Sequence, residues 1–439
     1  MTWRFACRLI KAAVVLSCLT ALLVYSFAAR RQPQDESSRH LPVDSERSEQ
    51  LHEETGIVGV SVPETTARPV HEVRVQVEAV NAEAEISNDD RFPPFDPVNG
   101  SVMVVQVHDR VHYLKRLVDS LRSVVGIEQT LLLFSHDLHD DAINAVVRSV
   151  DFCRVGQIFY PYSQQLYPDR FPGQDPRDCE ARVGKARAQR LGCQNWRYPD
   201  MYGHYRVANY TQIKHHWWWK LNHVFEAVPL VRNYSGYVLF LEEDYMLAPD
   251  ALHALRYLST NLMRLCEQCS LIVMGQYVKA NPQTVWLANH DRLAVQPWYS
   301  SRHNLGMAIS RHVWRQWRAC AELFCSFDDY NWDWSLMAVN LKCLAKPLWV
   351  LFPKASRVFH IGDCGVHHKC KSEASFERVS RVLAAASGQR KLFPAEFVVS
   401  DRSKRTLKAP KPNGGWADPR DHRLCLNNTR PAAGGSLAP

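Results

Sequence analysis

Three carboxylates follow directly on an apolar run near the middle of this 439-residue chain. The run spans Tyr237 to Leu241, and Glu242, Glu243 and Asp244 come immediately after it. An unbroken apolar run of this length is typical of a strand that is buried on both faces. Open α/β sheets bind ligands at the carboxyl ends of their strands, where a carboxylate can hold a hard divalent cation and, through it, a diphosphate. The alternative is a solvated strand end that caps the helix predicted from Pro249 to Leu265.

A second group of carboxylates lies among aromatic residues, in the sequence Phe-Asp-Asp-Tyr-Asn-Trp-Asp-Trp at 327–334. A carboxylate among aromatic residues, such as Asp333, can act as a general base toward a hydroxyl group. Tyr330, Trp332 and Trp334 could stack on sugar faces. The alternative is that Asp333 only caps a Trp-rich helix or forms a salt bridge in it.

Histidine and cysteine are concentrated in a later segment, residues 356–370. A carboxylate such as Asp244 together with one imidazole would suit Mn²⁺, if water and phosphate oxygens complete the coordination shell. A single His before Ile-Gly-Asp is also a common structural residue. The same segment ends in a group that has the composition of a zinc site, although an oxidising compartment favours a disulfide between its two cysteines. The group comprises Cys364, His367, His368 and Cys370.

The remaining cysteines indicate an oxidised, secretory-pathway protein. In a lumenal domain they should be largely paired, and an odd count leaves one unpaired. We predict that Cys153 is the free, buried thiol and that Cys179 pairs with Cys193. We also predict a structural bridge between Cys266 and Cys269, for which a redox motif is the alternative. Sequons for N-glycosylation agree with this compartment. They begin at Asn99, Asn209, Asn233 and Asn427.

The elements that would position these residues alternate between strands and helices. Ser101 to Val107 is an apolar, β-rich run that is followed by a helical pattern from Tyr113 to Leu121, and Thr130 to Phe134 is followed by a helical pattern from Ala142 to Val150. This alternation predicts an α/β fold with a parallel, doubly wound half. No glycine-rich phosphate motif follows either strand, which argues against a dinucleotide site or a P-loop. Two further strands are predicted at Leu271 to Gly275 and Gly306 to Ser310.

The stretch from Gln212 to Lys220 opens a predicted helix that runs to about Val228. It contains two adjacent histidines and three successive tryptophans, Trp217 to Trp219. Three successive side chains cannot share one helix face, so we expect some of the tryptophans to pack inward while others line a cleft. Packing of all three in the core is the alternative. The Pro- and Gly-rich segment from Pro161 to Asp200 is predicted to be an ordered loop.

The N-terminal region differs in composition from the rest of the chain. Ala12 to Ala29 is an 18-residue stretch without a charge, which predicts a transmembrane signal anchor after a cytosolic tail of residues 1–11. A cleaved signal peptide ending near Ala29 is the alternative. Residues 30–97 contain 7 basic and 15 acidic residues and few large apolar ones, which predicts an extended lumenal stem.

The stem has a net charge of −8 and residues 1–29 one of +3, so the total of +8 leaves +13 for residues 98–439, the predicted catalytic domain. A basic globular part suggests an anionic ligand or an anionic membrane surface. Nucleic acid is the poorer candidate, because no Arg/Lys-rich helix or stripe stands out and a membrane anchor argues against it.

Five sequence stretches together resemble the N-acetylglucosaminyltransferase II family, the alpha-1,6-mannosyl-glycoprotein 2-beta-N-acetylglucosaminyltransferases. They are QVHDR at 106–110, KHHWWWK at 214–220, LEED at 241–244, DDYNWDW at 328–334 and VFHIGDCGVHHK at 358–369. The resemblance extends from about Val102 to Cys425. It implies a GT-A type fold, with a Rossmann-like nucleotide-binding half and an acceptor half. It also implies inverting transfer of N-acetylglucosamine from UDP-GlcNAc, with Mn²⁺, to the α1,6-arm mannose of an N-glycan in the Golgi.

Individual roles also follow from the resemblance. Asp244 and His360 look like metal ligands, and Asp333 looks like the catalytic base. The residues that look like nucleotide-sugar contacts are Gln106, Val107, His108, Asp109, Arg110, Asp137, Gln212, Ile213, Lys214, His215 and His216. The chain departs from the family at Asp109, where we expect Asn, and at Asn281, where we expect Arg.

A function from another class is also compatible with the sequence. A membrane-anchored, lectin-like protein with a vestigial donor site would share the Trp-lined sugar pockets. Only an enzyme needs Asp244, His360 and Asp333 together.

Overall fold

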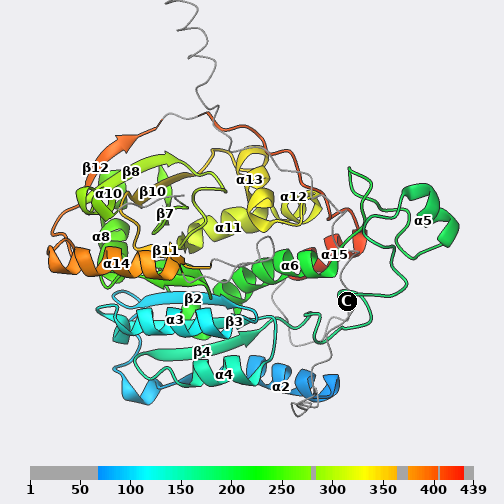
Figure 1. Ribbon diagram of the computed structural model, residues 1–439, viewed down its shortest axis with the longest axis horizontal. Coiled ribbons are helices and arrows are strands. Elements are labelled where there is room, and N and C mark those ends of the chain that lie inside the picture. Colours follow the sequence, from blue (N-terminus) through cyan, green and yellow to red (C-terminus); the bar gives the residue numbers. More distant parts are fainter. Residues whose placement is uncertain (1–67, 278–282, 363–373, 404–405, 430–439) are drawn as a thin grey trace, which may run out of the picture. The chain divides into compact units, whose positions relative to one another are not determined.

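The computed structural model describes residues 68–277, 283–362, 374–403 and 406–429 (Figure 1). These residues belong to one unit, Ala67–Pro439. The predicted anchor, Ala12 to Ala29, lies outside the described residues, as do Asn281 and the Cys364 to Cys370 group. Among the described helices, none has both the length and the apolar character that a membrane crossing requires.

A mixed ten-stranded sheet forms the centre of this unit, with the order β1-β4-β3-β2-β5-β9-β7-β10-β8-β12. Its strands are β1 (Ile86–Ser87), β2 (Ser101–Val107), β3 (Thr130–His136), β4 (Arg154–Phe159), β5 (Tyr237–Glu242), β7 (Cys269–Val273), β8 (Arg292–Pro297), β9 (Met307–Ser310), β10 (Trp349–Pro353) and β12 (Val398–Arg402). Strands β4, β3, β2 and β5 are parallel, which confirms the predicted α/β class and the parallel half. The chain moves outward from β2 through β3 to β4 and then returns to the other side of β2 as β5. The strand order therefore reverses between β2 and β5, where open sheets bind ligands.

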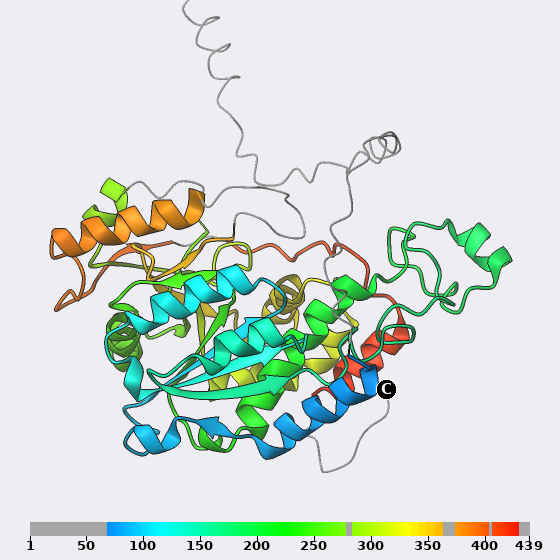
Figure 2. The ribbon, with the colours of Figure 1, turned by 60° about the horizontal axis from the view of Figure 1, so that its bottom comes forward.

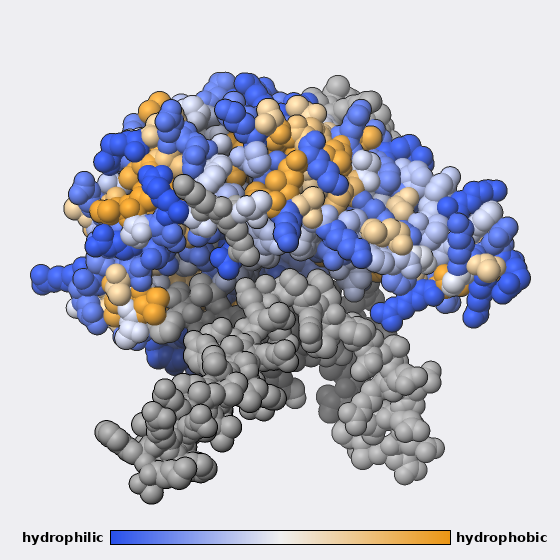
Figure 3. All heavy atoms as spheres, turned by 90° about the horizontal axis from the view of Figure 1, so that it is seen from above, coloured by the Kyte–Doolittle hydropathy of each residue, from blue (hydrophilic) through white to orange (hydrophobic). Residues whose placement is uncertain are grey.

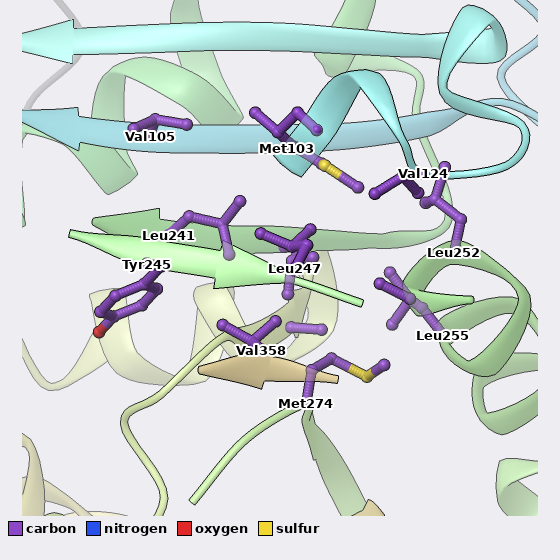
Figure 4. Packing of buried hydrophobic residues seen from close by; sticks show 14 of the residues in the cluster. Met103, Val105, Val124, Leu241, Tyr245, Leu247, Leu252, Leu255, Met274 and Val358 are labelled. Atoms are coloured by element: carbon purple, nitrogen blue, oxygen red, sulfur yellow. The ribbon is translucent and has the colours of Figure 1, made fainter. Parts of the chain in front are cut away.

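Helices cover both faces of the sheet (Figure 1). Side chains alternate between the two faces along each strand, so β2 places Met103 and Val105 in one core cluster and Val102 and Val104 in the other. Figure 4 shows members of the first cluster from β2, β5 and α8. The helices on this side are α3 (Val111–Arg122), α4 (Asp141–Arg148), α8 (Ala251–Thr260) and α9 (Leu262–Leu265). The other side has α6 (Ala208–Asn222), α11 (Arg311–Ala319), α12 (Ala321–Ser326), α13 (Trp332–Lys342) and α15 (Pro419–Asn427).

The remaining elements are short or peripheral. The helices are α2 (Val70–Glu83), α5 (Lys185–Leu191), α7 (Pro229–Arg232), α10 (Gln283–Ala288) and α14 (Ala374–Gly388). A separate two-stranded sheet pairs β6 (Tyr245–Leu247) with β11 (Val358–His360).

The region before β2 is folded, so the prediction of an extended segment through Pro97 was wrong for residues 70–87. Helix α2 packs Val73 and Val77 against Phe159 and Tyr167, and β1 pairs antiparallel with β4 (Figure 2). The two buried valines are four residues apart and therefore lie on one helix face. The net charge of −8 over residues 30–97 as a whole hid this narrow apolar stripe.

The three successive tryptophans of helix α6 are all buried. Trp217, Trp218 and Trp219 all lie in the second core cluster, so the prediction that some of them line a cleft was wrong and the core alternative holds. Trp217 stacks on Trp332 with ring centroids 4.2 Å apart, and Trp218 stacks on Phe324 at 4.2 Å. The sheet covers one side of α6, while α12, α13 and α15 cover the others, so the helix from Trp217 to Asn222 is buried on all sides.

The helix limits also differ from the predictions. Helix α6 begins four residues before Gln212 and ends in a π-helical turn, His223–Ala227. The helix predicted from Pro249 to Leu265 is divided into α8 and α9.

Four disulfides hold the described residues together. The predicted pairs Cys179–Cys193 and Cys266–Cys269 are confirmed, and Cys153 is confirmed as a free, buried thiol. Two longer-range pairs were not predicted. They are Cys320–Cys343 and Cys325–Cys425.

Candidate functional site

Two loops leave the sheet side by side at the point where its strand order reverses. Gln106 at the end of β2 pairs with Glu242 at the end of β5, so the residues that follow each strand emerge together. After β5 the chain enters β6, which pairs with β11 and places His360 opposite Tyr245. A histidine from far along the sequence therefore reaches the end of β5.

Asp244 and His360 form the centre of this site. The His360 Nε2 atom lies 3.1 Å from Asp244 Oδ2, and the same oxygen accepts a 2.8 Å hydrogen bond from Arg110 Nη1. Asp244 is only 3% exposed, and its Oδ1 atom has no hydrogen-bond partner among the described residues. Burial opposes ionisation of Asp244, but the hydrogen bond and charge of His360 and the charge of Arg110 leave its pKa below the usual value.

These two residues fit a divalent cation that a substrate helps to hold. The 3.1 Å separation of Nε2 and Oδ2 matches two neighbouring ligands of one octahedral ion, which lie about 3 Å apart when each bond is about 2.1 Å. The unpartnered Oδ1 of Asp244 provides a further lone pair. Among the described residues, no group of three or more His, Cys, Asp or Glu side chains could hold a metal by itself. Water and substrate oxygens would therefore fill the remaining positions.

The backbone beside the carboxylate requires glycine. A Cβ atom on Gly362 would lie 2.4 Å from Asp244 Oδ2, closer than any real Cβ contact. The amide of Ile361 donates a 2.9 Å hydrogen bond to the backbone oxygen of Asp244. The chain after His360 is thus fitted closely around Asp244.

Glu243 fixes the loop that follows β2. Its buried carboxylate accepts a 2.7 Å hydrogen bond from Arg110 Nε and a 2.8 Å hydrogen bond from the backbone amide of His108. Arg110 therefore bridges Glu243 and Asp244, and both loops are held in one arrangement. No individual role was predicted for Glu243, although it lies inside the acidic triplet.

A buried lysine supports the same loop from α6. Lys220 Nζ donates a 2.6 Å hydrogen bond to Gln106 Oε1. Burial lowers the pKa of Lys220, while burial and the neighbouring Asp244 charge raise the pKa of Glu242. Lys220 was not predicted as a site residue, since the three tryptophans dominate that stretch.

Asp137 connects β3 to the β2 loop and to α6. Its Oδ1 lies 2.6 Å from His108 Nδ1, and its Oδ2 accepts a 3.1 Å hydrogen bond from Gln212 Nε2. His216 Nδ1 is 3.5 Å from the same Oδ2, and Nε2 of that ring is 2.8 Å from Ser135 Oγ. The hydrogen bond with Asp137 raises the pKa of His108 to about 9, so the half-exposed His108 is an imidazolium at neutral pH.

The structure does not bring every predicted donor contact to this site. Lys214 Nζ donates to the backbone oxygens of Phe327 and Asp329, and His215 Nε2 lies 2.9 Å from Asp421 Oδ1. Both side chains are buried and face the α12 and α15 side of the helix. The other predicted contacts differ in exposure. Val107 has a buried side chain in the core, Ile213 is half-buried and Asp109 is exposed.

Asp333 lies in the first turn of α13. Its Oδ2 accepts a 2.9 Å hydrogen bond from Asn304 Nδ2, and burial raises its pKa to about 6. The adjacent Leu305 accepts a backbone hydrogen bond from Gly275, where an added Cβ would lie 2.1 Å from the oxygen of Val358. Since Val358 is two residues before His360, a short series of contacts connects Asp333 to the Asp244 cluster.

Asp329 organises the turn before α13. Its Oδ1 accepts from the amide and the side chain of Asn331, and its Oδ2 accepts from the amide and the side chain of Asn413. All four hydrogen bonds are between 2.8 and 3.0 Å long. Asn413, like Asn304, was not found from the sequence, because its partner lies far away along the chain.

Comparisons with known proteins show which sequences this chain resembles. A family model described as N-acetylglucosaminyltransferase II (MGAT2) matches residues 74–425. The alpha-1,6-mannosyl-glycoprotein 2-beta-N-acetylglucosaminyltransferase of Homo sapiens is 41% identical over 360 residues, which cover 81% of this chain and 79% of that protein. The protein of the same name from Arabidopsis thaliana is 31% identical over 345 residues, 77% of each chain.

Solved structures give a weaker likeness. The mannosyltransferase PcManGT from Pyrobaculum calidifontis, in complex with GDP-Man and Mn²⁺, is 12% identical, covers 84% of this chain and 88% of its own, and has a TM-score of 0.29. A TM-score of this size does not establish a common fold. The family model, by contrast, matches residues 74–425, which include every element that positions Asp244, Asp333 and His360. The chain belongs to the N-acetylglucosaminyltransferase II family.

Proposed function

We propose that this protein transfers N-acetylglucosamine from UDP-GlcNAc to the α1,6-arm mannose of an N-glycan core, in β1,2 linkage and with inversion. Membership of the family and the names of the relatives support the transferase class. The observation that carries the proposal is the Asp244–His360 pair, which lies at the switch point of the sheet with one buried carboxylate oxygen unused. We further propose a GT-A type fold. The parallel half of the sheet, in which Asp244 follows strand β5, is consistent with such a fold.

On the donor side, Asp244 and His360 would hold Mn²⁺. When bound, the cation offsets the negative charge that develops on the diphosphate leaving group. The imidazolium of His108 and the guanidinium of Arg110 add two fixed positive charges, which Asp137 and Glu243 hold in place. Fixed charges of this kind need no reorganisation during the reaction.

The proposed donor contacts are refined by the geometry. We propose Gln106, His108, Arg110 and Asp137 as direct donor contacts, with Gln212 and His216 orienting Asp137. Val107, Asp109 and Ile213 remain proposed contacts through their backbone atoms. Lys214 and His215 are assigned a structural role instead, because their side chains bind Asp329 and Asp421.

On the acceptor side, Asp333 would remove the proton from the attacking 2-hydroxyl of mannose. With a pKa of about 6 the carboxylate is largely ionised at neutral pH, yet it is more basic than an ordinary Asp. Asn304 fixes one of its oxygens with a hydrogen bond. The lectin-like alternative gains no support, since the family model and the relatives are all named as transferases.

The direct test of this function is mass spectrometry of defined N-glycans after incubation with UDP-GlcNAc and Mn²⁺. We expect one N-acetylhexosamine to be added to an acceptor whose α1,6-arm mannose is free. An otherwise identical acceptor with a 2-deoxy mannose on that arm should give no product. Addition to this control, or no product on either glycan, would contradict the assignment.

We also propose a type II topology in the Golgi membrane, with Ala12 to Ala29 as the anchor and the folded part, from Val70 onward, in the lumen. The four disulfides support an oxidising compartment. Three of the four sequons, at Asn99, Asn209 and Asn233, start at exposed residues.

Protease treatment of intact microsomes checks this topology. We expect the folded part to resist digestion until detergent opens the membrane. Digestion without detergent would show that the folded part faces the cytosol. A lumenal soluble protein serves as the control for membrane integrity.

A further inference from the structure

A lobe built around α5 stands away from the sheet, in the segment that links β4 to α6 (Figures 1 and 2). We define the basic lobe as residues 179–205. It has its own small core, in which Val183, Ala188 and Tyr205 pack around the Cys179–Cys193 disulfide. The lobe is therefore a stapled, preformed unit.

The exposed surface of the basic lobe is predominantly cationic, with Glu180 as its one exposed carboxylate. Residues 181–199 contain five basic residues and no acidic one. All five are exposed, and Figure 3 shows the projection on the right covered mostly by hydrophilic side chains. They are Arg182, Lys185, Arg187, Arg190 and Arg197.

The fold does not use these charges. Within the part of the chain that the structure describes, none of the five takes part in an ion pair, whereas other surface arginines do, such as Arg122 with Asp151. The guanidinium carbon of Arg197 lies over the ring of Trp196, 4.6 Å from the ring centroid. Five uncompensated cations repel one another, so their accumulation on a seven-residue helix and its flanks favours a role in binding an anion.

The base of the lobe adjoins the segment that carries the proposed catalytic base. The Met201 amide donates a 3.0 Å hydrogen bond to Asp328 Oδ2, and Tyr202 Oη donates a 2.8 Å hydrogen bond to the oxygen of Pro412. Asp200 Oδ2 accepts a 2.7 Å hydrogen bond from the amide of Gly415. Asp328 is five residues before Asp333 in the sequence. The lobe is therefore attached to the acceptor side of the protein.

We propose that the basic lobe binds an acidic polypeptide surface of the glycoprotein that carries the acceptor glycan. This inference rests on the proposed function, in which the acceptor is attached to a protein. The N-glycan core is uncharged, so the five cations have no partner in the glycan itself. The polypeptide must accompany its glycan to the acceptor side, where a cationic surface favours acidic sequences near the glycosylated Asn.

Exposed charges at the rim of an interface act mainly on encounter and are screened by salt. They bind the ground state and the transition state alike, so they lower KM and leave kcat unchanged. The lobe should therefore give a preference among glycoproteins that disappears at high ionic strength. It should have no effect on free glycans.

Two glycopeptides with the same glycan test this inference, one flanked by Asp and Glu and the other by Ser and Gly. At low ionic strength we expect kcat/KM to be about threefold or more higher for the acidic glycopeptide than for the Ser/Gly-flanked one. The difference should come from a lower KM, and its size is what several weak surface ion pairs would give. The triple variant Lys185→Glu, Arg187→Glu and Arg190→Glu should remove or reverse the preference. Its rate with the free glycan should stay at the wild-type level, which also reports correct folding.

The matched control is the triple variant Lys115→Glu, Arg148→Glu and Arg315→Glu. These residues are exposed on α3, α4 and α11. Their substitution changes the net charge of the protein by the same amount as the triple substitution in the lobe. We expect this variant to keep the preference for the acidic glycopeptide. A loss of the preference in it would mean that overall charge, and not the lobe, is responsible.

Several results would overturn the inference. Equal kcat/KM for both glycopeptides with the wild-type protein is one, and a preference that survives charge reversal of the lobe is another. Lobe-dependent binding to phosphatidylserine vesicles without any glycopeptide preference would assign the lobe to a lipid surface instead. A wild-type protein that does not act on the free glycan would refute the proposed function, which is a separate outcome.

Discussion

Asp333→Asn is expected to lower kcat by about 10² to 10⁴-fold, the usual contribution of a general base. Asn has nearly the same shape as Asp and can still bind Asn304, but its amide cannot take the proton of the acceptor hydroxyl. Affinity for UDP should change little, because the donor cluster is built from other residues. The comparison of kcat, UDP binding and melting temperature on one preparation checks this expectation.

The two neighbouring carboxylates provide controls for Asp333. Asp329 accepts four hydrogen bonds, and Asp328 accepts from the amides of Met201 and Trp416. Asp329→Asn should therefore lower the melting temperature more than the rate. If Asp333 were only a helix residue, its Asn variant would have near wild-type kcat, and Asp328 or Asp329 would become the candidate base.

The pH dependence gives a second measurement on Asp333. Because burial raises its pKa from 3.8 to about 6, the active, ionised form is lost as the pH falls through about 6. Below that value kcat/KM should fall about tenfold for each pH unit. The residual activity of Asp333→Asn should lack this acidic limb, while a limb that stays at the same pH would belong to another group.

Much of the fold could be predicted because its signals are local. The apolar run before Asp244 is a strand buried on both faces, and its five consecutive apolar residues indicate this without any knowledge of its neighbours. The Cys179–Cys193 and Cys266–Cys269 pairs could be predicted for the same reason, because the two cysteines of each pair are close in sequence. Helix α2 was missed, since only Val73 and Val77 are fully buried and the net charge of −8 of residues 30–97 dominated the prediction.

The candidate site was less predictable, because pairing between distant segments creates it. His360 reaches Asp244 only through the β6–β11 ladder, and its role came from a resemblance and not from local pattern. Which side of α6 faces the donor loops also depends on packing. Gln212 and His216, four residues apart, face Asp137, while His215 between them points to Asp421. No periodicity in the sequence separates these two directions.

Asp244→Asn is expected to lower activity at saturating Mn²⁺ by about 10² to 10⁴-fold, because it removes the one charged ligand that the protein offers to the cation. Asn keeps the shape and can still accept from Arg110, so the loops should remain in place. The independent measurement is the melting temperature. A ligand stabilises a protein in proportion to the logarithm of its concentration over Kd, so Mn²⁺ with UDP should raise the melting temperature of the wild type but not of this variant.

Asp109→Asn is the matched control for Asp244→Asn, since it removes one carboxylate from the same loops. Its side chain is exposed, and its nearest charged partner is His108 at 3.8 Å, so it holds no part of the cluster. We expect Asp109→Asn to keep both the activity and the response of the melting temperature to Mn²⁺ with UDP. Full activity of Asp244→Asn in EDTA would refute the cation site. An equal loss in both variants would instead point to the overall negative charge of the two loops, because only Asp244 is buried beside an imidazole.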